Sequence, residues 1–251
     1  MSKDKIVRAP AGKIAYLDCP SGVSGDMLLG AFCDAGLPLE TIKQGLAALG
    51  MSGYDIQLCA CTDQGIRGSH IDVVIDESKQ ESRHYTDIVA MLHNSSLAPQ
   101  VRDRAMAIFR TLGEAEAAIH GVKLEEIHFH EVGAIDSIVD IVGTVIALDA
   151  LDIVQLYASP LPFSRGHQRM AHGLMPLPAP ATLEILRRVK APWIACPIEA
   201  ELVTPTGAAI LATLARFEMP AMTIEQIGYG FGTMRLIWPN CLRVCIGRAY
   251  P

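Results

Sequence analysis

IHFHEVGAIDSIVDIVGT, at residues 127–144, places two histidines and three carboxylates within thirteen positions. Its first part, His128-Phe129-His130, alternates polar and apolar residues. If this part is extended, both imidazoles lie on one face, because strand side chains alternate with period two. His128, His130 and Glu131 would then offer nitrogen and oxygen ligands suited to a borderline divalent metal such as nickel, zinc or cobalt.

The second part of the stretch predicts a buried helix over Ala134–Leu151. Nearly all its positions are apolar, which leaves almost no polar face. Asp136 and Asp140 are four residues apart and share one stripe of this helix. Burying an ionised carboxylate is costly, so the two need a cation or hydrogen-bond donors nearby. Alternatively, His128 and His130 pair with them in a polar network that holds no ligand.

Composition limits the classes of function. The chain has 251 residues, half of them hydrophobic and 19% charged, with a net charge of −6. That length allows one large domain or two small ones, and the acidic balance argues against a nucleic-acid partner. No apolar run approaches the roughly eighteen residues of a membrane span, so we expect a cytoplasmic protein without a membrane partner. Seven cysteines without a Cys-x-x-Cys pair favour reduced thiols over a zinc site.

A strand, a small-residue loop and a helix are predicted near the N-terminus. The strand covers Lys13–Cys19, and the loop that follows directs backbone N–H groups toward an anion in front of it. The candidate residues here are Asp18, Ser21, Gly22, Ser24, Gly25 and Asp26. As an alternative, Ser24 or Asp26 only caps the helix.

The middle of the chain predicts a hairpin over Tyr54–Asp76 and helices over Tyr85–Leu92 and Pro99–His120. Between the hairpin and the first of these helices, residues 77–83 are polar and form the best linker candidate. Strands and helices mix without strict alternation. We therefore expect an α+β architecture, with two lobes around a central cleft as an option and a lobe junction near residues 77–83.

The last third of the chain supplies further candidate loops. Val154–Phe163 predicts a strand, and a proline-rich segment at 175–180 is incompatible with a helix or a central strand. A helix is predicted to open at 204–208 with Thr206 as its N-cap, and Thr204, Thr206 and Gly207 are candidate cofactor-binding residues. A strand then runs into Gly228-x-Gly230-x-Gly232, which fits either a phosphate loop or simple backbone flexibility.

Several long blocks resemble one known family. In chain order they are LDCPSGVSGDMLLGA (17–31), EIHFHEVGAIDSIVDIVG (126–143), SPLPFSRG (159–166), AHGLMPLPAPATLEIL (171–186), ELVTPTGAAIL (201–211) and IGYGFGT with PNCLRV (227–244). Together they resemble the LarC family. Its members insert nickel during biosynthesis of the nickel-pincer nucleotide cofactor of lactate racemase and related enzymes.

The resemblance implies a nickel chelatase of the lyase class. Its substrates would be Ni²⁺ and pyridinium-3,5-bisthiocarboxylic acid mononucleotide, and insertion would depend on CTP with Mn²⁺ or Mg²⁺. In this interpretation His128, His130 and Glu131 receive nickel. A metal–phosphate group of the nucleotide is held by the carboxylates Asp18, Asp26, Asp136 and Asp140.

Two departures from the family pattern affect this interpretation. The segment Glu77–His84 contains one histidine where family members carry a histidine-rich tract. Family members also continue into a C-terminal domain that is the implied CTP site, whereas this chain ends at Pro251. We therefore expect either an N-terminal portion that acts with a separate C-terminal portion or a truncated product, and a homo-oligomer is compatible with the sequence.

Two alternative functions remain open on the sequence. One is a nickel-binding metallochaperone or subunit that acts with a separate C-terminal portion and performs no turnover. The other is a metal-dependent phosphohydrolase, which rests only on the carboxylates and the glycine-containing loops.

Overall fold

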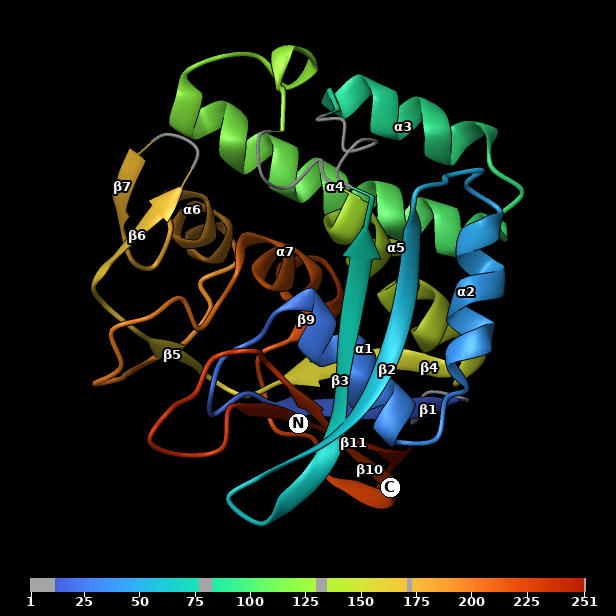
Figure 1. The fold of residues 1–251 in the computed structure, drawn as a ribbon, viewed down its shortest axis with the longest axis vertical. Coiled ribbons are helices and arrows are strands. Elements are labelled where there is room, and N and C mark those ends of the chain that lie inside the picture. The colour runs from blue at the N-terminus through green and yellow to red at the C-terminus, as the bar shows by residue number, and fades with distance from the viewer. Residues whose placement is uncertain (1–11, 77–82, 130–134, 171–172, 251) are drawn as a thin grey trace, which may run out of the picture.

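The fold is known from a computed structural model that describes residues 12–76, 83–129, 135–170 and 173–250 (Figure 1). Its helices are α1 (Gly25–Asp34), α2 (Leu39–Ala47), α3 (Tyr85–Asn94), α4 (Pro99–His120), the 3-10 helix η2 (Leu124–Glu126), α5 (Ile135–Ala150), α6 (Pro180–Arg188) and α7 (Pro205–Leu214). Its strands are β1 (Lys13–Asp18), β2 (Tyr54–Asp63), β3 (Ile66–Ile75), β4 (Ile153–Ala158), β5 (Leu161–Phe163), β6 (His167–Met170), β7 (Gly173–Pro176), β8 (Trp193–Ala195), β9 (Ala215–Arg216), β10 (Met222–Phe231) and β11 (Cys241–Ala249). The predicted α+β class is therefore confirmed.

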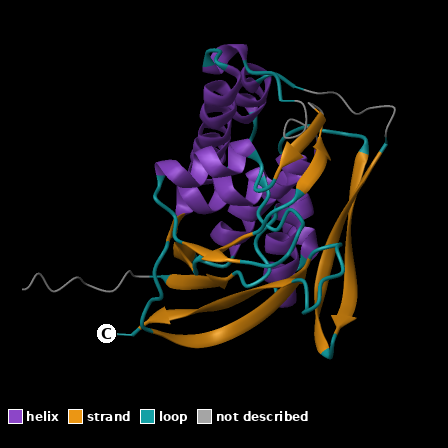
Figure 2. Cartoon of the chain, turned by 90° about the vertical axis from the view of Figure 1, so that its left-hand side faces the viewer, coloured by secondary structure: helices purple, strands orange, loops and turns teal. Residues whose placement is uncertain are grey.

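One seven-stranded mixed sheet organises the strands, in the order β2-β3-β10-β11-β1-β4-β9. At its centre β1 pairs antiparallel with β11 and parallel with β4. Two small sheets, β5–β8 and β6–β7, lie outside it. Figure 2 shows the helices gathered on one side of the large sheet, with the β2–β3 hairpin rising beside them.

Helix α5 forms the centre of the core, as its apolar pattern predicts. Twelve of its sixteen residues are buried. It packs against α1, α2, α4 and α7, and against β3 and β4 of the sheet. Ile138, Ile141 and Val145 are fully buried, and each such side chain contributes roughly 1.5–3 kcal/mol relative to an exposed position.

The buried side chains form one continuous cluster that extends from Ala15 in β1 to Ile246 in β11. A division into two lobes stays a prediction, because residues 77–82 of the expected junction lie outside the described residues.

Glycines in β10 allow helix α1 to lie directly on the strand. A Cβ atom at Gly230 would lie 1.8 Å from the Met27 carbonyl oxygen, and one at Gly228 would lie 2.0 Å from that of Ala31. Both distances are far below van der Waals contact. Close helix–strand packing therefore accounts for these two members of the Gly228-x-Gly230-x-Gly232 run.

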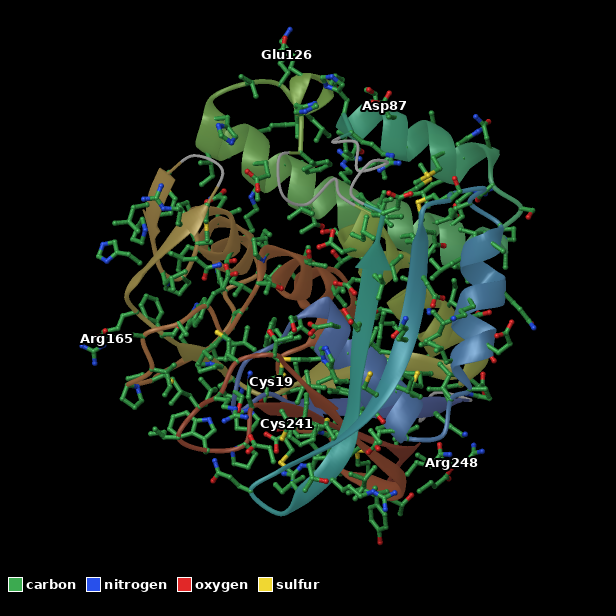
Figure 3. All side chains as sticks on the ribbon, viewed as in Figure 1. Cys19, Asp87, Glu126, Arg165, Cys241 and Arg248 are labelled. Carbon is green, nitrogen blue, oxygen red and sulfur yellow. The ribbon has the colours of Figure 1, made fainter. Side chains whose placement is uncertain are left out.

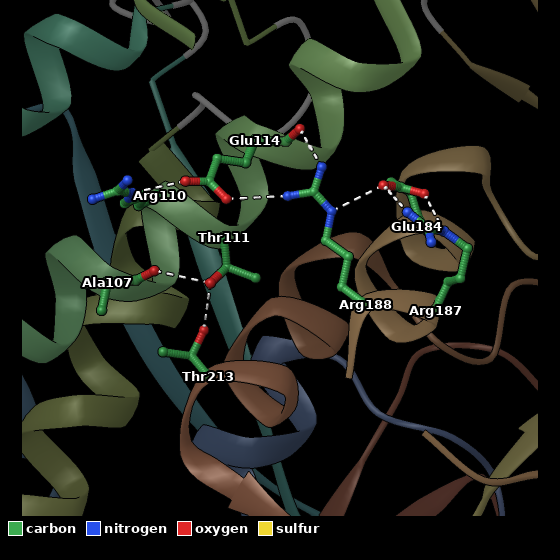
Figure 4. A network of polar contacts seen from close by, with 8 residues as sticks. All are labelled: Ala107, Arg110, Thr111, Glu114, Glu184, Arg187, Arg188 and Thr213. Atoms are coloured by element: carbon green, nitrogen blue, oxygen red, sulfur yellow. Dashed lines mark hydrogen bonds and ion pairs between the residues drawn. The ribbon is translucent and has the colours of Figure 1, made fainter. Parts of the chain in front are cut away.

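A polar network attaches α6 and α7 to α4 (Figure 4). Arg188 of α6 donates to Glu114 of α4 at 3.1 Å and to Glu184 of its own helix at 2.9 Å. The hydroxyls of Thr111 in α4 and Thr213 in α7 are 2.9 Å apart. These contacts are largely exposed, so they orient the helices more than they stabilise them.

The segment predicted as one strand over Val154–Phe163 is two strands, β4 and β5, interrupted at Ser159 and Pro160. Proline has no N–H to donate, and Ser159 instead accepts a hydrogen bond from the Cys19 N–H at 3.0 Å. The proline-rich segment 175–180 ends β7 and contains the first residue of α6, Pro180. Its exclusion from a helix or a central strand therefore holds for residues 175–179 but not for Pro180, which occupies the first helical position, where no N–H donor is needed.

The seven cysteines are free thiols, in agreement with the sequence. Cys19 and Cys241, labelled in Figure 3, are buried. Burial raises the pKa of the Cys33 thiol to about 11, so this group stays protonated at neutral pH. Within the described ranges, none of the helices has the length and apolar character needed to cross a bilayer.

The α1–β10 contact gives a direct test of the fold. Gly230→Ala should lower the free energy of unfolding by roughly 1–3 kcal/mol or more, because the added methyl forces α1 away from the strand. Urea denaturation measures the change, and Thr223→Ala, at an exposed position of the same strand, should stay within about 0.5 kcal/mol of the wild type. Equal stability of the two variants would contradict the packing described here.

Candidate functional site

Three helices begin at one cavity of about 380 Å³. The helices are α1, α5 and α7, and β3 forms a further part of the wall. The lining residues are Ser24, Gly25, Asp26, His70, Ile71, Asp72, Val73, Asp136, Ser137, Asp140, Glu201, Thr204, Pro205, Thr206 and Thr233. The structure thus brings together the predicted carboxylates Asp26, Asp136 and Asp140, although they come from distant parts of the chain.

The charges around this cavity are unbalanced. Its wall carries five carboxylates, and no Lys or Arg is among the described residues that line it. Each helix N-terminus contributes the equivalent of roughly half a positive charge, which does not offset the carboxylates. The arrangement therefore favours a cation, and the free N–H groups of the helix ends can receive an anion beside it.

Asp140 lies against the first residue of α1. A Cβ atom at Gly25 would lie 2.3 Å from Asp140 Oδ2, so only glycine leaves room for this carboxyl. Asp140 Oδ1 is fully buried and has no hydrogen-bond partner among the described residues. Burial raises the pKa of Asp140 well above its ordinary value, and the charges of Asp26 and Asp136 raise it further.

Asp136 and Asp26 differ from Asp140 in having hydrogen-bond donors. The Ser137 N–H donates to Asp136 Oδ1 at 2.7 Å, but burial still raises the pKa of Asp136. The Ser24 hydroxyl donates to Asp26 Oδ1. Ser24 holds the N-cap position of α1, yet its side chain makes no capping hydrogen bond. Ser24 therefore occupies the N-cap position, as the capping alternative predicted, but its side chain does not make the hydrogen bond that a cap would make.

His70 of β3 is a cavity residue that the sequence reasoning missed. Its Nδ1 atom lies 2.9 Å from the Phe231 carbonyl oxygen and 3.9 Å from Asp26 Oδ2. Asp72, two positions further along the strand, also lines the cavity. The sequence did contain a signal for this residue: His70 and Asp72 are two positions apart in a predicted strand, so their side chains lie on the same face.

A second cavity of about 290 Å³ adjoins the first and shares Ser24, Asp26, Glu201, Thr204 and Thr233 with it. Its remaining lining is uncharged: Ser21, Met27, Gln168, Leu202, Gly232, Met234 and Asn240. The second cavity therefore has two carboxylates in its lining, Asp26 and Glu201, against five in the first.

Hydrogen bonds hold the predicted loop after β1 in place. The Ser21 hydroxyl donates to the Pro239 carbonyl at 2.9 Å and accepts from Trp238 Nε1 at 3.1 Å. Gly22 has φ +89°, a conformation that favours glycine. Val23 N–H donates to the Leu202 carbonyl, which joins the loop to the segment before α7.

The start of α7 corrects one prediction. Thr204, and not Thr206, is the N-cap, and its hydroxyl accepts a hydrogen bond from the Gly207 N–H at 3.1 Å. Pro205 occupies the first helical position, which needs no N–H donor, so the cap must precede it. Thr206 lines the acidic cavity, and Gly207 packs against the Val23 carbonyl.

The other predicted site residues lie elsewhere. Asp18 forms an ion pair with Arg243, its register partner on β11, and lines neither cavity. The ring of His128 is 4.6 Å from that of His84 in an edge-to-face contact, and it too is absent from both linings. His130 and Glu131 lie outside the described residues.

Helix N-termini that meet a carboxylate-lined cavity are typical of proteins that bind a divalent cation together with a phosphorylated ligand. The chain matches the nickel insertion protein family over residues 15–250 and belongs to that family.

Named relatives extend this match. The chain is 48% identical over 237 residues to the pyridinium-3,5-bisthiocarboxylic acid mononucleotide nickel insertion protein of Desulfitobacterium hafniense, covering 94% of this chain and 58% of that protein. It is 47% identical to the protein of the same name from Geobacillus kaustophilus, covering 94% and 60%. A Thermomicrobium roseum protein whose name proposes nickel insertion is 50% identical, covering 95% and 59%. The chain thus spans about 60% of the length of these curated relatives. No solved structure matches the chain.

The buried carboxyl of Asp140 predicts a pH-dependent stability. Because its pKa is raised on folding, the folded state keeps the proton longer, and stability is lost as pH rises above the unfolded value of about 3.9. Asp140→Asn removes this loss. In metal-free protein its free energy of unfolding relative to wild type should therefore increase from pH 4 to pH 8, by about 1.4 kcal/mol for each unit of the pKa shift.

Urea denaturation in EDTA measures this difference. Asp149→Asn, which changes an exposed carboxylate at the other end of α5, serves as the matched control and should show no such trend. If Asp140→Asn is less stable than the wild type by the same amount at every pH, the prediction is wrong. The charge of the ionised Asp140 carboxylate would then be compensated by other groups in the folded protein.

Proposed function

We propose that this chain binds Ni²⁺ and pyridinium-3,5-bisthiocarboxylic acid mononucleotide, and that it takes part in inserting nickel into this nucleotide. The product would serve the nickel-pincer cofactor of lactate racemase-type enzymes. Family membership supports the reaction class. The observation that carries the site is the convergence of Asp26, Asp136 and Asp140 with three helix N-termini on one cavity.

A divalent cation is the natural companion of a phosphate in this cavity. The carboxylates alone would repel the phosphate, and no basic side chain among the described lining residues offsets them. Mn²⁺ or Mg²⁺ suits oxygen ligands. Among the described residues no three acidic, histidine or cysteine side chains are placed to hold a cation by themselves, so Asp26, Asp136 and Asp140 would bind it together with the phosphate oxygens of the nucleotide. The buried Asp140 Oδ1 atom, which lacks a donor among the described residues, fits this role. When bound, the cation would neutralise charge between the carboxylates and the phosphate.

The second cavity, whose unshared lining residues are uncharged, suits the remainder of the nucleotide. Gln168 and Asn240 provide amide groups there, and Thr233 provides a hydroxyl at the boundary with the acidic cavity. Hydroxyl and amide groups of this kind can bind the ribose without adding charge.

His128, His130 and Glu131 remain the proposed capture site for nickel. Neutral imidazole binds nickel, and the two thiocarboxylate sulfurs of the nucleotide, which are softer ligands, would then accept it. We further propose that insertion depends on CTP with Mn²⁺ or Mg²⁺, and that the reaction takes place in the cytoplasm.

A second candidate function is favoured by the fact that the chain spans only part of the length of its relatives. Because the chain spans about 60% of their length, it could act as a nickel-binding metallochaperone or subunit that needs the remaining portion for turnover. The two candidates differ in whether this chain alone forms product.

The insertion assay separates these candidates. The chain is incubated with NiCl₂, the metal-free nucleotide, CTP and MnCl₂, and the nickel-containing nucleotide is detected by mass spectrometry. Under the primary proposal product forms, and Asp136→Asn, which removes a cavity carboxylate, should lower the rate at least about 10-fold, while Asp149→Asn should not. Nickel binding without product would support the metallochaperone. An absence of both nickel and nucleotide binding would contradict both candidates.

The proposed capture site has its own test. Isothermal titration with NiCl₂ should show that His128→Ala/His130→Ala loses at least one nickel-binding equivalent relative to wild type, because two imidazole ligands are removed. The exposed His93→Ala provides the control. Unchanged stoichiometry and affinity in the double variant would exclude this segment as the capture site.

A further inference from the structure

We propose that the face of the large sheet opposite the helices is the surface on which the remaining portion of the longer relatives packs. The residues that define this open face are Tyr16, Asp18, Tyr157, Ile227, Tyr229, Arg243 and Cys245. None of them lines either cavity. The open face is therefore an interaction surface separate from the candidate site, and it goes beyond the proposed binding of nickel and nucleotide.

The directions of the side chains follow from the glycines of β10. Gly228 and Gly230 face α1, because a Cβ atom on either would meet the backbone of that helix. Side chains alternate along a strand, so Ile227 and Tyr229 point to the other side of the sheet. Residues that are paired across neighbouring strands share a face, and the register therefore adds Cys245 and Arg243 of β11, Tyr16 and Asp18 of β1, and Tyr157 of β4.

The described helices cover only the opposite face of this sheet. Helix α1 packs on β10 and β11, and α5 and α7 pack on β4. Figure 2 shows these helices on one side of the sheet, with none of the described helices on the other side. The part of the chain that the structure describes thus leaves the open face without a covering layer of helices.

Aromatic and apolar side chains occupy outward positions of this face. Three of the six tyrosines of the chain, Tyr16, Tyr157 and Tyr229, stand on it, and all three are half-buried. Ile227 is 46% exposed. An antiparallel sheet with one solvated face usually carries polar residues at such positions. Tyrosine is instead enriched where two protein surfaces meet, because it combines a large apolar ring with a hydroxyl that can hydrogen-bond.

The open face is large enough for an interface between domains. Its four strands, β10, β11, β1 and β4, are six to ten residues long. They give a surface about 19 Å wide and 20–30 Å long, or roughly 500 Å² on one side. Interfaces between domains of one chain bury about 600–1,500 Å² over both sides. Arg243 is paired with Asp18, but its side chain is still 46% exposed and can donate to a partner.

The lengths of the relatives identify what packs there. The chain matches them over 94–95% of its own length but over only 58–60% of theirs, so the rest of each relative lies outside the matched segment. The family match runs from residue 15 to residue 250. Its two ends lie side by side, because β1 and β11 are neighbours that pair Ile14 with Gly247. A further portion joined at either end therefore begins beside the open face.

A chimera tests this surface. The chain is joined to the part of the Desulfitobacterium hafniense protein that lies outside the matched segment, at the same end as in that protein. Hydroxyl-radical labelling, without nickel or nucleotide, then compares the chimera with the chain alone. Labelling of Tyr16, Tyr157 and Tyr229 should fall at least about 3-fold, because the core of an interface excludes water. Tyr54 and Tyr85, which are half-buried on β2 and α3, serve as internal controls and should keep their labelling.

Two matched variants of the chimera provide a second measurement. Ile227→Asp places a charge on the open face, whereas Ile119→Asp places one on α4, and the two isoleucines are 46% and 45% exposed. Ile227→Asp should return the labelling of the three tyrosines to within about 2-fold of that in the chain alone, and Ile119→Asp should leave their protection intact. Since both positions are exposed, both variants should fold, and cooperative urea unfolding checks this.

Unchanged labelling of the three tyrosines in the chimera would overturn the assignment, and so would protection confined to Tyr54 and Tyr85. If labelling of the open face falls in the chain alone as its concentration rises, a second copy covers the face and the assignment is wrong. The insertion assay gives an independent result. Protection without product would keep this surface and contradict the proposed reaction, whereas product without protection would do the reverse.

Discussion

Helix α5 meets water only near its ends, and both the core and the candidate site depend on this constraint. Along its length it is enclosed by α1, α2, α4, α7 and the sheet. Asp136 and Asp140 lie in its first turns, where the cavity opens. An ionised carboxylate in the middle of the helix would have neither solvent nor a cation to compensate it. The helix that fills the core therefore also provides the most strongly perturbed carboxyl of the site.

The cavity combines two opposing electrostatic features. Three helix N-termini favour an anion, but with roughly half a charge each they are weaker than the five carboxylates that share the wall. An anion alone would be repelled by the carboxylates, and a cation alone would be disfavoured by the three helix N-termini. A cation that carries an anion with it satisfies both features, and this is the physical basis of our proposal that a metal and a mononucleotide bind together.

Periodicity allowed much of the fold to be predicted, because α5, α4 and the β2–β3 hairpin each have a regular apolar pattern. The meeting of Asp26 with the α5 carboxylates was also within reach, since loops of small residues and buried charges both indicate a ligand. Contacts that depend on how the strands pair in the sheet could not be predicted from the sequence. The register of β1 against β11 pairs Asp18 with Arg243, and the pairing of β3 with β10 brings His70 to the cavity. Such register is a property of pairing between distant segments and has no local signal.

Because Gly25 of α1 lies against Asp140 of α5, the spacing between these two helices limits which substitutions the chain tolerates. Because protein interiors transmit small displacements, a change at Gly143 of α5, where an added Cβ atom would lie 3.2 Å from the Leu29 side chain of α1, would alter the spacing between α1 and α5 at the cavity. Apolar residues that do not line the cavity thereby act on its shape. Substitutions in this core are therefore limited by the shape of the cavity as well as by stability, and a substitution that the fold tolerates could still change the cavity.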